Sequence, residues 1–216
     1  MARFLKMRIK IKDDAADIER KIAKAVSQEF NRKISTGVNN IERDIKSLAR
    51  DLLSVSPEIQ SLRNGELRGA FGIPKEIDAT VEIVEAIVQS IDVNHTIVSG
   101  GRGGLRGGLT IEAQPADFSN LLSLPNSKVV TKKGATLPWL QWLLTLGDKI
   151  IITEYEVDYE DGSGRSGLAS MSKGGTFRVN PSFSGTVEDN FITRALNNDD
   201  FKSELSDIIK KNLSNK

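Results

Sequence analysis

The sequence has 216 residues, enough for one large or two small domains, and 30 basic residues nearly balance 29 acidic ones. The net charge of +1 excludes the overall basic excess that is typical of nucleic-acid-binding proteins. The absence of cysteine excludes disulfides, cysteine–zinc sites and thiol catalysis. A single histidine leaves little material for histidine-based catalysis or a multi-histidine metal site.

The first predicted element is a strand over residues 4–12, because apolar and basic residues alternate there. Its apolar face consists of Leu5, Met7, Ile9 and Ile11. Its basic face consists of Lys6, Arg8, Lys10 and Lys12. The charges along this stretch argue against a signal peptide, and Asp13 and Asp14 suit the start of a helix.

A long helix is predicted from Asp14 to Val55, because apolar residues recur every three or four positions. The first half of the pattern consists of Ile18, Ile22, Val26, Phe30, Ile34 and Val38. The second half consists of Ile41, Ile45, Leu48, Leu52 and Val55. Unbroken, the helix would span roughly 60 Å, which exceeds the diameter of a domain of this size. Either the helix breaks near Gly37 and packs within the chain, or its apolar seam, with Ile41 and Ile45, contacts another subunit.

The middle of the chain contains a turn at 64–72, a helix at 78–91 and a hairpin whose strands are residues 93–98 and 108–113. The glycine-rich residues 99–108 join these strands and carry Arg102 and Arg106, which suit anion binding. No Gly-Lys-Ser/Thr follows, so the segment is not a nucleotide-binding P-loop. We expect a mobile hairpin tip that becomes ordered against a partner; a contact with a nucleic-acid backbone is the alternative.

The most distinctive stretch runs from Leu137 to Tyr159 and predicts a buried aromatic helix, closed by Gly147, and then a strand. One face of this strand is acidic and consists of Glu154, Glu156, Asp158 and Glu160. Alternation spaces these carboxylates about 6.5–7 Å apart in a line, which does not form a metal cage. The row is expected either to pair with the basic strand, within or between chains, or to line a channel and repel DNA.

The last third predicts a hairpin through residues 161–164, a second turn at 172–175 and two helices at 187–196 and 200–213. Ser166 does not lie in a nucleophile elbow, because the glycine spacing is wrong and no helix follows. We therefore predict one α+β domain, residues 1–216, with a strand and long helix (1–56) and a helix and sheet core (57–216). The long N-terminal helix packs on a mainly antiparallel sheet, and short helices end the chain. We expect no catalytic residues, cofactor or metal.

Several stretches resemble the neck, or tail-completion, proteins of long-tailed bacteriophages. Asn64-Gly65-Glu66-Leu67-Arg68-Gly69 resembles their Gly-x-Leu-Arg turn, although the usual Pro-Val-Asp-Thr lead-in is absent. Residues 136–144 (TLPWLQWLL), 164–167 (GRSG) and 183–196 (FSGT…NFITRAL) resemble a block of virion proteins of this type. Together these stretches comprise 33 of the 216 residues.

The resemblance implies a structural subunit without enzymatic activity, located in the virion and in the host cytoplasm during assembly. It implies a homo-oligomeric ring, six- or twelve-fold, between the portal or adaptor and the tail, with passive contact to DNA and no membrane. A tail terminator or baseplate subunit is the alternative within this class. A nucleic-acid-binding module that uses Arg102, Arg106 and the basic strand is the alternative from another class, and the missing nucleophile and base disfavour a hydrolase.

Overall fold

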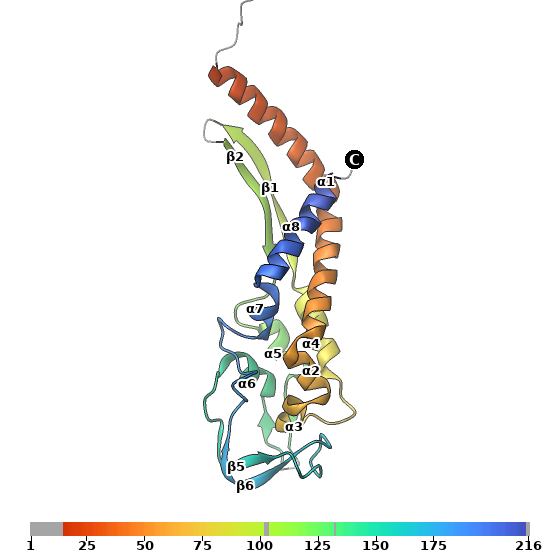
Figure 1. Ribbon diagram of the computed structural model, residues 1–216, viewed down its shortest axis with the longest axis vertical. Helices are drawn as coiled ribbons and strands as arrows, with labels where there is room; N and C mark the ends of the chain where they lie inside the picture. The colour runs from red at the N-terminus through yellow and green to blue at the C-terminus, as the bar shows by residue number, and fades with distance from the viewer. Residues whose placement is uncertain (1–14, 102–103, 132, 215–216) are drawn as a thin grey trace, which may run out of the picture. The chain divides into compact units, whose positions relative to one another are not determined.

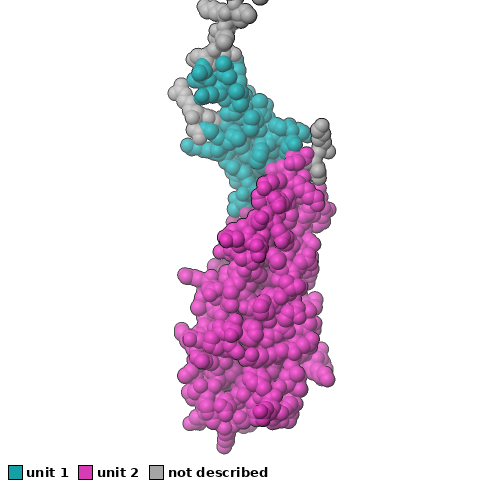
Figure 2. All heavy atoms as spheres, viewed as in Figure 1, with its two compact units in different colours: residues 1–39, 93–110 teal, residues 40–92, 111–216 magenta. Residues whose placement is uncertain are grey.

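The computed structural model describes residues 15–101, 104–131 and 133–214, and its fold is α+β as predicted. A long helix, α1 (Ala15–Val55), is accompanied by antiparallel strand pairs and short C-terminal helices (Figure 1). The predicted basic strand at 4–12 lies outside the described residues. The chain divides into two compact units, residues 1–39 with 93–110 and residues 40–92 with 111–216 (Figure 2). The single-domain interpretation stays a prediction.

Helix α1 continues without interruption from Ala15 to Val55, so the predicted break near Gly37 is wrong. A glycine inside a helix costs only about 1 kcal/mol relative to alanine, and the segment contains no proline. Ion pairs one turn apart support the helix, such as Arg32 with Glu29 at 2.7 Å and Lys46 with Glu42 at 2.5 Å. The local preference for helix therefore exceeds the cost of the glycine.

The first unit combines the first part of α1 with most of a two-stranded sheet, β1 (Asp92–Gly101) and β2 (Gly104–Glu112). The two strands run side by side in opposite directions (Figure 1), which confirms the predicted hairpin. Most of the glycine-rich segment 99–108 is strand, so its prediction as a loop is wrong. Gly107 shows the reason: its φ is 106°, and a Cβ there would lie 2.5 Å from the carbonyl oxygen of Ile97. Glycine lets the two backbones approach each other at this position.

The second unit holds the rest of α1 and the other helices of the described residues. These are α2 (Pro57–Asn64), α3 (Glu66–Phe71), α4 (Ala79–Gln89), α5 (Ser119–Leu122), the 3-10 turn η1 (Pro125–Ser127), α6 (Trp139–Thr145), α7 (Phe191–Leu196) and α8 (Asp199–Ser214). Polar contacts tie α1 to two of them. Arg50 pairs with Glu85 of α4 at 2.6 Å, and Asn212 of α8 donates to Asp44 at 3.1 Å. The hydrogen bond from Asn212 is the main reason why the pKa of Asp44 is lowered.

Two strand pairs complete the second unit, β3 (Val129–Val130) with β4 (Thr136–Leu137) and β5 (Ile152–Asp158) with β6 (Ser170–Phe177). Both pairs are antiparallel, and β5–β6 confirms the predicted hairpin. The predicted turn at 172–175 is wrong, because β6 continues through it as a bulge. The register passes from Thr153 opposite Thr176 to Tyr155 opposite Lys173, so Gly174 and Gly175 together face a single residue.

The core of the second unit is built around α6, whose sequence is apolar almost all round. Trp139 is completely buried, and its indole N–H donates to the carbonyl of Asn126 at 3.0 Å. The Trp139 ring lies 5.5 Å from Phe71 of α3, and Phe71 meets Phe177 of β6 edge-on at 6.5 Å. Gly147 follows the helix with φ 62°, as the left-handed cap that the sequence predicts.

Candidate functional site

The predicted interface residues are distributed over both units, and some cannot be placed. Lys6, Arg8, Lys10, Lys12 and Arg102 lie outside the described residues. Arg106 lies in β2 and is exposed. The predictions for the basic strand and for Arg102 therefore stay predictions.

Ile41 and Ile45 of α1 are completely buried within the single chain. Ala49 and Leu53 on the same face of the helix are also completely buried. No neighbouring subunit is needed to remove these side chains from water. Substitution of Ile41 or Ile45 therefore probes folding of the chain before it probes assembly.

The predicted acidic row on β5 is interrupted. Glu154 has φ 66° and lies at the bulge, which breaks the two-residue alternation of side chains. Glu156 and Asp158 lie opposite Ser172 and Ser170 of β6, and Glu160 lies beyond the end of the strand. The carboxylate of Asp158 accepts the backbone N–H of Glu160 at 2.9 Å, so it stabilises the turn. Pairing of the acidic residues with the basic strand stays a prediction.

Glu66 of α3, in the Gly-x-Leu-Arg stretch, contacts residues that lie just before two of the other resembling stretches. Its carboxylate accepts a hydrogen bond from Asn180 at 2.7 Å and a longer one from the Tyr159 hydroxyl at 3.4 Å. Burial, followed by the negative charge of Glu66, raises the pKa of Tyr159 to about 12. Next to this group, a Cβ on Gly69 would lie 3.1 Å from the Ala169 side chain, so helix and loop approach closely.

Arg68, also in the Gly-x-Leu-Arg turn, is 6% exposed, and among the described residues it donates to three backbone carbonyls. One guanidinium nitrogen donates to Arg63 at 2.6 Å, and another donates to Pro74 and Ile77 at 2.6 and 2.9 Å. The planar fork of donors suits this task, because it reaches several carbonyls at once. Arg68 therefore holds the segment after α3 against the end of α2.

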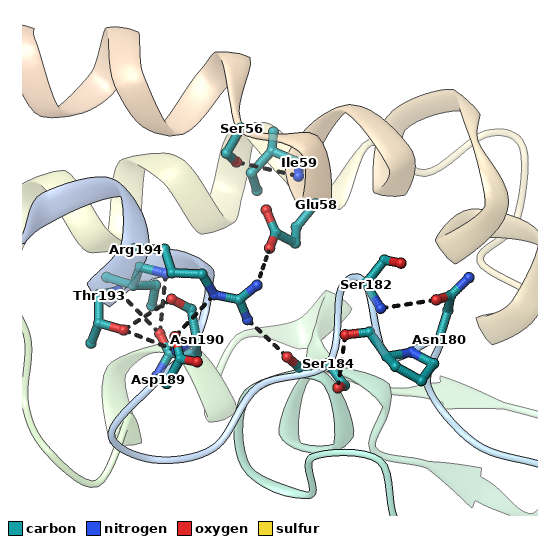
Figure 3. Close-up of polar contacts among 12 residues, drawn as sticks. Ser56, Glu58, Ile59, Asn180, Ser182, Ser184, Asp189, Asn190, Thr193 and Arg194 are labelled. Carbon is teal, nitrogen blue, oxygen red and sulfur yellow. Dashed lines mark hydrogen bonds and ion pairs between the residues drawn. The ribbon is translucent and has the colours of Figure 1, made fainter. Parts of the chain in front are cut away.

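The last resembling stretch is fixed to α2 by an ion pair between Arg194 of α7 and Glu58 (Figure 3). The Arg194 guanidinium lies 3.0 Å from the Glu58 carboxylate and donates to the Ser184 carbonyl at 2.8 Å. It also lies 3.2 Å from the carboxylate of Asp189. The Glu58 side chain is 6% exposed and that of Arg194 is 37% exposed. The pair therefore joins a buried carboxylate to a cation that keeps partial access to water.

Asn190 begins α7 with a reciprocal capping arrangement (Figure 3). Its side chain accepts from the N–H groups of Ile192 and Thr193, and Thr193 accepts the N–H of Asn190. Gly185 packs beside it, and a Cβ there would lie 2.7 Å from the Asn190 Cβ. The Gly185 carbonyl accepts the N–H of Gly147 at 2.8 Å. This stretch therefore closes over the end of α6.

The surface next to Glu66 is hollowed. A depression of about 310 Å³ is lined by α3, β5 and residues 176–181, including Phe71, Glu156 and Arg178. A second one of about 270 Å³ lies between α3 and residues 163–171. Both border the resembling stretches, so this end of the second unit offers a shaped surface with mixed charge.

The residues considered for catalysis take structural positions. The ring of His95 contacts the Asn31 carboxamide at 3.3 Å, and Ser166 is 2% exposed and accepts the N–H of Leu168. Within the described residues, no group of three or more histidine, aspartate or glutamate side chains is placed to hold a metal ion. Among the same residues, no helix combines the length and hydropathy that a membrane span requires.

Comparison with known proteins finds no matching family model, no matching curated protein and no matching solved structure.

Sequence reasoning missed the contacts that fix the resembling stretches to the rest of the second unit, namely those of Glu58, Glu66 and Arg194. One signal was visible: Asn190, three residues before Thr193 and next to an apolar run, is typical of a helix start. The ion pair of Glu58 with Arg194 has no such local signal, because 136 residues separate its partners.

Proposed function

We propose that this chain is a structural virion protein of a tailed bacteriophage, a neck or tail-completion subunit. Copies of the chain form a ring that joins the portal or adaptor of the capsid to the tail. The neighbours of the ring are portal and tail proteins, and DNA passes through its lumen without being bound. The protein is located in the host cytoplasm during assembly and acts in the completed virion.

The observation that carries the proposal is the convergence of the resembling stretches. Residues 64–69, 136–144, 164–167 and 183–196 are separated in sequence but meet within the second unit. Gly69, Leu137 and Arg165 line one depression, and a Cβ on Gly185 would lie 2.9 Å from the Leu143 carbonyl oxygen. Motifs that share one packed scaffold support a common architectural role better than scattered matches would. The buried charged side chains of this scaffold, Glu58 and Arg68, form their ion pair or hydrogen bonds with other groups of the same chain.

The test is complementation of assembly. In a phage whose copy of this gene is disrupted, full heads and complete tails are expected to accumulate separately. Addition of the purified protein should restore joined particles, and electron microscopy should show it as a ring at the neck. Native mass spectrometry of the purified protein gives the copy number. Lys210→Met, on an exposed ion pair, is the matched variant and should complement like the unmodified protein.

Other outcomes identify the alternatives. Tails of irregular length in the mutant would indicate a tail terminator, and tails without a tip structure would indicate a baseplate subunit. DNA binding that falls steeply and linearly with the logarithm of salt concentration would indicate a nucleic-acid-binding module. Normal particles without the protein would overturn the proposal.

A further inference from the structure

The depression of about 270 Å³ between α3 and residues 163–171 contains a guanidinium, that of Arg165. One of its terminal nitrogens donates to the Val130 carbonyl at 2.5 Å. A Cβ on Gly72 would lie 3.1 Å from the other terminal nitrogen and 3.6 Å from Nε, so the glycine leaves room beside these two donors. Arg165 is half-buried and, within the described residues, forms no ion pair. The depression therefore holds a cation without a counter-charge in the described part of the chain.

Exposed apolar side chains lie next to this guanidinium. Met171 lines the depression and is 41% exposed, and Val130, whose carbonyl Arg165 contacts, is 59% exposed. Arginine beside apolar side chains is typical of the energetic centre of a protein interface. Pockets for drug-sized ligands usually have about 300–1,000 Å³, so this smaller depression suits one or two side chains of a protein. Its chemistry favours an acidic side chain next to an apolar one.

The turn that precedes α7, in the same unit, has this complementary composition. Val187 is 51% exposed, and the adjacent Glu188 is also exposed. Within the described residues Glu188 forms no ion pair, whereas its neighbour Asp189 pairs with Arg194 at 3.2 Å (Figure 3). The N–H of Thr186 donates to the Asp189 carbonyl at 2.7 Å, which closes the turn. A fixed turn therefore presents an apolar and an acidic side chain to solvent.

We propose that Val187 and Glu188 of one copy of the chain insert into the depression of a neighbouring copy. The Glu188 carboxylate pairs with the Arg165 guanidinium, and Val187 packs on Met171 and Val130. The inference rests on the proposed function, because it names a contact between copies that a ring requires. Two different patches of the chain meet in this contact, and heterologous contacts of this kind can close into rings. The half-buried guanidinium gains the counter-charge that the described part of its own chain does not supply.

A free small carboxylate and an acidic segment of another virion protein are the competing occupants. A small carboxylate would pair with Arg165 but would leave Val130 and Met171 exposed. The turn of a second copy satisfies the cation and the apolar side chains together, because Val187 and Glu188 are adjacent. A second copy also supplies the turn and the depression in equal numbers.

Charge reversal followed by native mass spectrometry of the full chain tests the contact. Arg165→Glu and Glu188→Arg should each weaken self-association about tenfold or more, because like charges then meet in a half-buried site. An equimolar mixture of the two variants should recover assemblies with even numbers of chains. Each reversed depression then accepts the reversed turn of the other variant, and the unmodified patches also match. Recovery on mixing is specific to a contact between chains.

Matched variants keep this test decisive. Glu188→Arg remains informative if Arg165→Glu disturbs the fold, because Glu188 forms no ion pair within the described residues. Lys202→Glu and Glu204→Arg, at exposed positions of α8, are the control charge reversals and should leave self-association unchanged. Self-association of both test variants like that of the unmodified chain, or no recovery on mixing, would overturn the proposal. Loss of particle assembly in Arg165→Glu without loss of self-association would assign the depression to another protein and would also overturn it.

The contact and the proposed function fail in different experiments. A purified chain that stays monomeric but restores joined particles would overturn the contact between copies and would keep the neck assignment. Chains that associate through Arg165 and Glu188, in a phage that forms normal particles without the protein, would support the contact and overturn the neck assignment.

Discussion

Glu58 at the start of α2 and Arg194 in α7 form an ion pair at 3.0 Å across 136 residues of sequence. The carboxylate is buried, and the guanidinium is partly open to water and also donates to the Ser184 carbonyl. This contact ties the last of the stretches that resemble neck proteins to the helix that follows α1. Loss of either partner should therefore affect the packing of α7 on the second unit.

Arg194→Met should destabilise the protein by about 2 kcal/mol. Removing one member of a buried pair costs about 3–5 kcal/mol, and the partial exposure of Arg194 reduces this value because water replaces some of the lost contact. Urea unfolding followed by circular dichroism measures the change. Lys210→Met, in the exposed pair with Asp207, is the control and should leave the unfolding midpoint unchanged. Equal effects of the two substitutions would contradict the buried character of the Glu58 contact.

Gly185→Ala should be more damaging than Gly134→Ala. A Cβ at Gly185 would lie 2.7 Å from the Asn190 Cβ and 2.9 Å from the Leu143 carbonyl oxygen, so the segment at Gly185 would have to move away from both. Gly134 has open space around it but φ 82°, so alanine there should cost only about 1–2 kcal/mol of backbone strain. Thermal unfolding of both variants separates the clash from the strain. A larger loss at Gly134 would show that the close approach at Gly185 is easily relieved.

Asn31→Ala should loosen the hairpin of the first unit, because the carboxamide makes both a donor and an acceptor contact with the Val98 backbone. Loss of such a part-buried pair costs about 1–3 kcal/mol. The expected result is faster hydrogen exchange at the β1 amides, Val98 included. Asn39→Ala, at an exposed position of the same helix, is the matched control and should leave β1 exchange unaltered. Unchanged protection of β1 in Asn31→Ala would contradict the role of this contact.

Tyr159 should ionise near pH 12, because burial and the charge of Glu66 both oppose formation of the phenolate. The pKa of Tyr159 is higher in the folded than in the unfolded protein. Its contribution to stability is therefore complete below about pH 10 and is lost as the pH rises toward 12. Absorbance titration of the Tyr155→Phe variant isolates Tyr159, since these are the two tyrosines of the chain. Glu66→Gln should lower the midpoint, and an unchanged midpoint would exclude Glu66 as a cause.

The sequence alone determined the elements whose signals are local. The three- and four-residue spacing from Ile18 to Val55 predicted α1, the apolar run at 138–146 predicted the buried α6, and alternation predicted β5. These signals are reliable because helix and strand periods are set by backbone geometry within a few residues. The glycines were harder to interpret, since glycine permits turns, bulges and close strand contacts alike. Residues 99–108 and 172–175 therefore proved to be mostly strand instead of loop and turn.

Tertiary structure alone decided which surfaces meet. Periodicity shows where the apolar residues of α1 lie, but it cannot show that β1 covers the row of Ser27 and Asn31 and leaves Ile22 exposed. The contacts of Glu58 with Arg194 and of Glu66 with Asn180 join residues more than a hundred positions apart. Such pairs leave no mark in a single sequence, because each partner is an ordinary polar residue until the fold removes it from water.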